Sequence, residues 1–140
     1  TDYLAERAWP VLREVSEWVV RFVTTTHRGY ETLHLQSPAE RFQNVNNDAF
    51  TNMACIRTLQ LAIAAAERLG KVVPATWRDV AERLVLPIDP ATGPLLLFEG
   101  YDGAGGSSPP VMPSASPLGF DLDADVEKTT RLHSLDHADD

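Results

Sequence analysis

The sequence predicts an all-α fold of consecutive helical hairpins, with at most one short β-hairpin near residues 30–36. Apolar residues recur at three- and four-residue steps along residues 11–23, which is the periodicity of an amphipathic helix. A second stretch, Ala49–Leu69, is apolar almost all the way round a helix and is followed by Gly70. Strand-like alternation is seen only loosely, in Tyr30–Leu35 after the turn-forming Gly29.

We expect a short helix near Asp2–Ala8 and a longer one from about Trp9 to Thr25. They are separated because Pro10 has no N–H group and interrupts a helix. The apolar face predicted for the longer helix consists of Val11, Leu12, Val15, Trp18, Val19, Phe22 and Val23.

The helix predicted over Ala49–Leu69 can be capped at its start by Asn47 or Asp48. A helix that is apolar nearly all round is buried on more than one side, so it needs neighbours on both faces. A third helix is expected to begin at Thr76 as N-cap, with Asp79 three residues later in a box-like arrangement, and to end by Pro87.

Residues 100–117 are rich in Gly, Ser and Pro and are predicted to form a long loop within the domain. A last helix is expected after Asp121, running through Val126 toward Leu132. The acidic residues at positions 121, 123 and 125 suit its N-terminus electrostatically.

The composition excludes several classes of function. A net charge of −8 argues against broad binding to nucleic acid or anionic lipid. The longest unbroken apolar run, Leu61–Ala66, is too short to span a bilayer, so no membrane partner is expected. The lone Cys55 and four scattered His predict no metal site, and the absence of a Gly-rich phosphate loop after a strand predicts no cofactor.

The polar stretch 36–48, just before the most apolar helix, is the most informative part of the sequence. Its charged and amide side chains are of the kind that hydrogen-bond sugar hydroxyls, and one carboxyl group can protonate a glycosidic oxygen. A surface loop that only caps the next helix explains the same composition. The residues concerned are Glu40, Arg41, Gln43, Asn44, Asn46, Asn47 and Asp48.

The run SPAERFQNVNNDAFTNMACIRTLQLA, residues 37–62, resembles the segment around the catalytic acid of glycoside hydrolase family 65. That family includes maltose, kojibiose and trehalose phosphorylases, acid trehalases and glucosylgalactosyl-hydroxylysine glucosidases. The flanking stretches RAWPVLREVSEWVVRFV, TWRDVAERLVLPIDP, FEGYDG and PLGFDLDADV are similar to others in the family, in the same order. The matching residues are Pro38, Glu40, Val45, Asn46, Asn47, Phe50, Thr51 and Asn52.

The resemblance implies that residues 1–140 are part of an (α/α)6-barrel catalytic domain acting on α-glucosides such as trehalose, kojibiose or glucosyl-galactose. Glu40 takes the place of the general acid of an inverting enzyme. Arg41, Gln43, Asn46 and Asn47 are candidate sugar contacts or loop braces, with bracing expected for the two asparagines. Hydrolysis is favoured, and inorganic phosphate would be the co-substrate of a phosphorylase.

Two alternatives remain open. Where this sequence has Ser37, Ala39, Arg41 and Phe42, the family usually has Gly, Asp, an aromatic residue and His, so a catalytically degenerate relative is possible. Arg41 beside Glu40 would also lower the pKa of that carboxyl group, against the need of an acid. The chain is too short for a whole barrel. Its apolar faces are therefore expected to be covered by the rest of a barrel or by self-association, and a non-catalytic helical interaction module is the other alternative.

Overall fold

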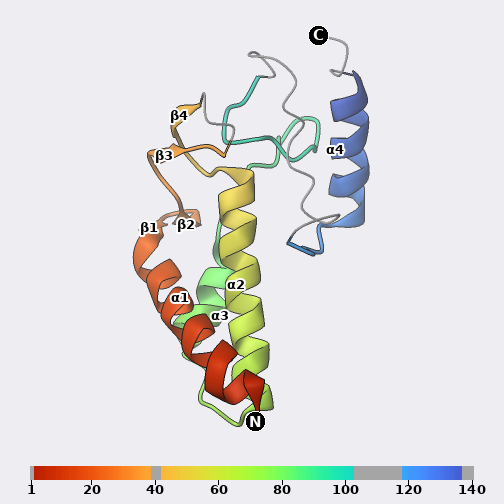
Figure 1. Ribbon diagram of the computed structural model, residues 1–140. Helices are drawn as coiled ribbons and strands as arrows, with labels where there is room; N and C mark the ends of the chain where they lie inside the picture. The colour runs from red at the N-terminus through yellow and green to blue at the C-terminus, as the bar shows by residue number, and fades with distance from the viewer. Residues whose placement is uncertain (1, 39–41, 103–117, 137–140) are drawn as a thin grey trace. The chain divides into compact units, whose positions relative to one another are not determined.

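A computed structural model describes residues 2–38, 42–102 and 118–136, with side chains as far as residue 133 (Figure 1). These residues are mainly helical, which confirms the predicted class. In chain order the elements are a π-helical turn η1 (Leu4–Ala8), α1 (Trp9–Phe22), β1 (Thr24–Thr26), β2 (Gly29–Glu31), β3 (Leu35–Gln36), β4 (Gln43–Val45), α2 (Ala49–Arg68), α3 (Ala75–Arg83) and α4 (Ala124–Asp136).

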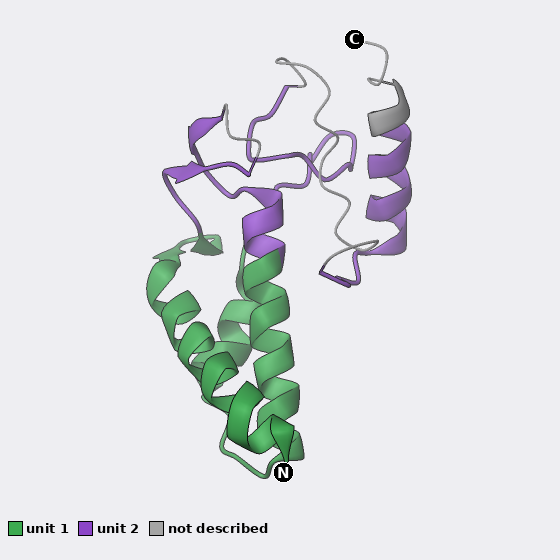
Figure 2. Ribbon diagram, viewed as in Figure 1, with its two compact units in different colours: residues 1–31, 54–85 green, residues 32–53, 86–140 purple. Residues whose placement is uncertain are grey.

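The described chain forms two compact units (Figure 2). Unit 1 consists of residues 1–31 and 54–85 and holds α1, the first hairpin, most of α2 and α3. Unit 2 consists of residues 32–53 and 86–140 and holds the second hairpin, the first turn of α2 and α4.

The start of unit 1 shows how the chain accommodates Pro10. The Trp9 N–H donates to the Leu4 carbonyl, a wide π-type turn, and α1 continues directly from it with Pro10 in its first turn. The helix ends at Phe22 and not at Thr25, because Thr24–Thr26 pair with Gly29–Glu31 as an antiparallel hairpin. Three consecutive β-branched threonines favour that extended conformation.

The predicted apolar face of α1 is only partly buried. Val19 and Val23 belong to the core of unit 1. Val11, Val15 and Trp18 are 62%, 40% and 52% exposed, and the Trp18 ring stacks on that of Phe22 with 4.5 Å between centroids. The helix thus has the predicted apolar face, but in the described chain part of that face is exposed to solvent.

Hairpin β1–β2 is hydrogen-bonded to α3 and to the residue shortly after its end. The Val85 N–H donates to the Tyr30 carbonyl at 2.9 Å, and the Tyr30 hydroxyl donates to Asp79 Oδ2 at 2.5 Å. The prediction of a Thr76 N-cap is wrong: the helix begins at Ala75 after Pro74, with no side-chain cap. Asp79 bonds instead to Tyr30 and to Arg83, one turn further along.

The boundaries predicted for the long helix are confirmed. The Thr51 N–H donates to Asp48 Oδ1 at 2.9 Å, so Asp48 is the cap, and Gly70 adopts a left-handed φ of 62° after the last turn. By length and mean hydropathy α2 could also cross a membrane, but 56% of the window concerned is buried inside the protein, as in a core helix. The expectation that no segment is long and apolar enough to span a bilayer is therefore not met by α2, in which polar residues interrupt the apolar runs.

Unit 2 contains a hairpin that the sequence did not predict, so the described residues hold two antiparallel pairs where at most one was expected. Its strands β3 and β4 pair Leu35 with Val45 and Gln36 with Gln43 across an irregular register. Their short, mostly polar sequences lack the alternation that signals a strand. The last helix, α4, begins as predicted, and Asp123 Oδ1 accepts the Asp125 N–H at 3.0 Å.

Candidate functional site

The predicted acid, Glu40, and its neighbour Arg41 lie outside the described residues. The two ends of their loop are well defined in unit 2. The Ser37 N–H donates to the Phe42 carbonyl at 2.9 Å, and the Ser37 hydroxyl donates to Asp48 Oδ2 at 2.8 Å. The residues on either side of the undescribed positions, Ser37 and Phe42, are therefore bonded to each other, and Ser37 is also bonded to the cap residue of α2.

Backbone strain is concentrated around this loop. Among the described residues, the non-glycine residues with positive φ are His34 at 57°, Asn44 at 59° and Asn47 at 49°. Left-handed backbone costs non-glycine residues free energy and is typically retained where the surroundings enforce it, often at functional sites. The loop 38–41 lies within the segment that these three residues span.

Asn47 is the centre of a buried polar network. Its side chain is fully buried, and Asn47 Oδ1 accepts the Thr32 N–H at 3.1 Å and the Asn52 amide at 3.4 Å. Its Nδ2 donates to Glu99 Oε2 at 2.7 Å, and its backbone N–H donates to the Thr32 carbonyl at 2.7 Å. These contacts are those of a brace, the role expected for this residue.

Asn46 makes two contacts of the same kind. Its Oδ1 accepts the His34 N–H at 3.0 Å, and its carbonyl accepts the Glu99 N–H at 3.1 Å. Gln43, in contrast, is exposed on β4 opposite Gln36. The structure thus brings Asn46 and Asn47 together around one framework, while Gln43 lies on the open side of the hairpin.

Glu99 belongs to this framework, although no role was predicted for it. It is exposed, yet one of its carboxylate oxygens bonds to the buried Asn47 amide and its N–H bonds to Asn46. The residue lies 52 positions from Asn47 in the sequence, so local pattern gives no sign of the contact. The only available signal was that FEGYDG is one of the stretches that resemble the family.

Three aromatic rings pack together beside the end of the loop. Ring centroids are 5.1 Å apart for Phe42 and Phe98, 5.7 Å for Phe42 and Tyr101, and 5.2 Å for Phe98 and Tyr101. These distances are typical of favourable tilted and edge-to-face packing. These rings hold Phe42 against residues 98–101, and Glu99 in that segment is bonded to Asn46 and Asn47.

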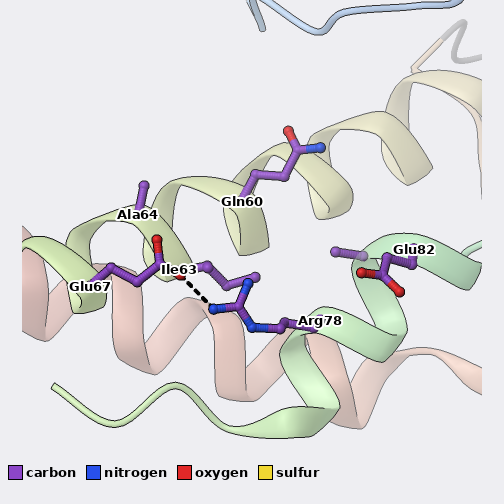
Figure 3. Close-up of a pocket in the computed structure, with 7 residues that line it drawn as sticks. Gln60, Ile63, Ala64, Glu67, Arg78 and Glu82 are labelled. Carbon is purple, nitrogen blue, oxygen red and sulfur yellow. Dashed lines mark hydrogen bonds and ion pairs between the residues drawn. The ribbon is translucent and has the colours of Figure 1, made fainter.

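A separate hollow of about 350 Å³ lies in unit 1, on α2 and α3 (Figure 3). An ion pair between Glu67 and Arg78, with 2.5 Å between Oε1 and Nη2, crosses it. The hollow does not include any predicted site residue. In the part of the chain that the structure describes, no three His, Cys, Asp or Glu side chains gather as a metal site would require.

Comparison with known proteins finds relatives whose names describe sugar-cleaving enzymes. No protein-family model matches the chain. It is 31% identical over 61% of its length to kojibiose hydrolase from Flavobacterium johnsoniae, and 28% identical over 61% to the periplasmic acid trehalase of Saccharomyces cerevisiae. It is 27% identical over 79% of its length to protein-glucosylgalactosylhydroxylysine glucosidase from Danio rerio.

The chain spans 13%, 7% and 17% of the length of these three relatives, so it corresponds to a short segment of each. A solved structure assigned as a kojibiose phosphorylase from the human microbiome superposes on 72% of the chain, with a TM-score of 0.56, 19% identity and 17% of that structure covered. At this identity the superposition shows the fold alone, which is mainly helical, and it confirms the predicted class. These relatives are of the kinds that the resemblance to glycoside hydrolase family 65 named, so the resemblance is confirmed, and the chain corresponds to a short segment of such proteins.

Proposed function

We propose that this chain forms part of the catalytic domain of an inverting glycosidase that acts on α-glucosides, with Glu40 as general acid. Glu40 would protonate the bridging oxygen as the bond to the glucosyl unit breaks, while water attacks the opposite face of the sugar. Hydrolysis is favoured because the curated relatives named above are a kojibiose hydrolase, an acid trehalase and a glucosidase. In a phosphorylase, inorganic phosphate would attack in place of water.

The observation that best supports this proposal is the hydrogen-bonded framework at the ends of the Glu40 loop. At the ends of the loop, Ser37 bonds to Phe42 and to Asp48. The next residues along the chain, Asn46 and Asn47, are held by bonds to His34, Thr32 and Glu99. An acid that must reach one oxygen atom needs a support of this kind, because a small displacement of a catalytic group costs much of its effect. Arg41 and Gln43 remain candidate contacts to the sugar.

The test is an assay of the complete protein on kojibiose, trehalose, maltose and glucosyl-galactose, with and without inorganic phosphate. We expect free glucose from at least one substrate, and a Glu40→Gln variant that loses at least a hundredfold in kcat, in line with the usual contribution of general acid catalysis. Glu82→Gln, a change of an exposed carboxylate in unit 1, is the matched control and should keep full activity.

Equal activity of the wild type and the Glu40→Gln variant would show that the acid is a different residue. Glucose 1-phosphate formed only with phosphate would show a phosphorylase. The catalytically degenerate alternative predicts that the wild type releases no sugar under any of these conditions.

The second candidate role is that of a helical module whose exposed apolar surface packs against another part of the protein or against a second copy of the chain. The exposed side chains of α1 favour this role. Val11, Val15 and Trp18 follow one another at helical spacing and are each at least 40% exposed. We propose that the remainder of a barrel covers this stripe in the complete protein, and that self-association covers it when the chain is alone. This role is compatible with a catalytic one.

A further inference from the structure

We infer that the hollow on α2 and α3 receives the apolar stripe of α1 from a second copy of this chain. This inference rests on the second role proposed above, self-association, and adds to it the surface that the stripe contacts. The stripe consists of Val11, Val15 and Trp18, and it is exposed, so it does not fill the hollow of its own copy. Unit 1 therefore has a projecting apolar surface on one helix and a recessed one between two others (Figure 3).

The lining of the hollow suits the close approach of another helix. The hollow has a volume of about 350 Å³, and Ile63, Ala64 and Ala81 form its apolar lining. Small side chains at a contact favour the short end of the usual spacing of packed helices, which is about 8–10 Å between axes. Gln60 and Glu67 are the first and last lining residues on α2, and they are two helical turns, about 10 Å, apart.

The stripe matches the hollow in length. Its ends, Val11 and Trp18, are also two helical turns, about 10 Å, apart on α1. The Trp18 ring stacks on that of Phe22 with 4.5 Å between centroids, so the largest side chain of the stripe is already held by its own helix. Side chains that are ordered before binding lose little conformational entropy when they bind. The stripe is therefore a preformed ridge of the length that the hollow accepts.

Charged groups beside the two surfaces are complementary. Arg57 lies two turns before Ala64 on the same side of α2, and its buried Nε has no hydrogen-bond acceptor in the described chain. Glu17 precedes Trp18 on α1, and among the described residues its side chain is in no hydrogen bond or ion pair. A buried charged donor without an acceptor costs free energy, which a carboxylate would offset. Glu17 of the second copy is the carboxylate that the stripe brings to this end of the hollow.

The stripe and the hollow are different surfaces, so the contact between copies is heterologous. Each copy can offer its stripe to one neighbour and its hollow to another. A contact of this kind adds copies one after another, whereas an interface of one surface with itself stops at a two-fold pair. We therefore expect species larger than a dimer as the concentration of the chain rises.

The experiment mixes two variants of the 140-residue chain, each without one of the two surfaces. Val11→Lys with Val15→Lys removes the stripe, and Ala64→Lys blocks the hollow; all three positions are exposed, so the fold should be kept. In sedimentation velocity each variant alone should associate at least tenfold more weakly than the wild type, because the contact would bury an unpaired charge. Mixed together they should form a one-to-one complex, since one keeps the hollow and the other keeps the stripe. Val72→Lys, at an exposed position outside both surfaces, is the control and should associate like the wild type.

The outcomes separate this inference from the role on which it rests. A wild-type chain that is monomeric at every concentration overturns both. If the wild type associates but Ala64→Lys associates equally well, or if the mixture gives no one-to-one complex, self-association stands and the hollow is not its site.

The charged pair provides a second measurement. Glu17→Arg should weaken association, because Arg57 then faces a like charge, and adding Arg57→Gln to the same chain should recover part of it. A Glu17→Arg chain that associates as strongly as the wild type overturns the inference.

Discussion

Asn47 shows how much of the local structure one side chain can hold. Its amide bonds to Thr32, Asn52 and Glu99, and its backbone is in the left-handed region. The sequence predicted a brace at this position from the resemblance and from the general capping preference of asparagine. It gave no indication of the partners, because Thr32 and Glu99 lie 15 and 52 positions away.

We expect Asn47→Ala to lower the free energy of unfolding by about 2–4 kcal/mol, since it leaves the buried Thr32 N–H without this acceptor and keeps a strained φ. Asn47→Gly loses the same amide but tolerates the left-handed backbone, and should be less harmful by about 1 kcal/mol. Urea unfolding measures both. If alanine and glycine cost the same, the backbone strain at this position is not significant.

Cys55 is the second residue with a clear expected behaviour. It is buried in α2, and burial raises the pKa of its thiol to about 11. Because the thiolate is the reactive form, we expect almost no labelling by a disulfide reagent at pH 8 in the native protein. Adding guanidinium should release one thiol per chain. Rapid labelling before unfolding would show that this part of α2 opens readily.

At the scale of elements, the contact of hairpin β1–β2 with the end of α3 leaves no room for a side chain at Gly29. A Cβ atom on Gly29 would lie 2.4 Å from the Arg83 carbonyl oxygen, and the φ of Gly29 is +131°. The sequence identified Gly29 as a turn residue, but the close approach of α3 depends on tertiary packing. Gly70, at a φ of +62°, has open space around it.

This contrast gives a matched pair of substitutions. Gly29→Ala should cost more than about 3 kcal/mol, because the backbone of either segment must move. Gly70→Ala should cost about 1 kcal/mol, from the left-handed φ alone. Thermal unfolding of the two variants provides the comparison, and similar losses in both would mean that the Arg83 contact yields easily.

The Tyr30–Asp79 bond joins the same two elements and should depend on pH. The hydrogen bond between the two side chains lowers the pKa of Asp79 and raises the pKa of Tyr30. A lowered carboxyl pKa adds stability above the unfolded value of about 3.9, and this stability is lost as the pH falls through the folded pKa. The raised Tyr pKa adds stability below about pH 10, which is lost as the pH rises through the folded value.

Tyr30→Phe should therefore be less stable than the wild type between about pH 5 and 9, and the difference should shrink toward pH 2. Urea titrations across this range measure it. Tyr3→Phe is the control, since Tyr3 is 72% exposed, and it should have no effect at any pH. A difference for Tyr30→Phe that stayed constant down to pH 2 would exclude Asp79 as the source of the stabilisation.

The elements also show where prediction from sequence succeeded. The boundaries of α2 and the start of α4 were predicted because caps and apolar period are local properties of the chain. The strands β3 and β4 were missed because their pairing depends on contacts across residues 32–47 and not on alternation. At the candidate site, Glu40 and Arg41 lie outside the described residues and their roles stay predictions. The contact of Glu99 with Asn47 was not predicted.

At the scale of the whole molecule, the chain corresponds to a segment of much longer relatives. Its exposed apolar surface is what a segment without its packing neighbours would have. The stripe of Val11, Val15 and Trp18 on α1 leaves large apolar side chains exposed at helical spacing. The sequence predicted that α2 needs neighbours on both faces, since that helix is apolar nearly all round. In the structure the clearest exposed stripe lies on α1.

We expect the isolated 140-residue chain to self-associate, as sedimentation velocity would show. Val11→Lys with Val15→Lys should shift it toward the monomer and reduce the binding of a hydrophobic dye, because both changes place charge in the stripe. Val72→Lys, which changes an apolar residue that is 90% exposed outside the stripe, should have little effect. A wild-type chain that sediments as a monomer without binding dye would contradict the expected role of the stripe.

The hydrogen bond between Ser37 and Phe42 has a consequence for how this protein can diverge. Ser37 is bonded to Phe42 and to the α2 cap Asp48, and neither bond uses a residue of the tetrapeptide between Ser37 and Phe42. We therefore expect these two bonds to persist when residues of the tetrapeptide are substituted. Relatives with the same fold would then differ in specificity through substitutions at positions 38–41.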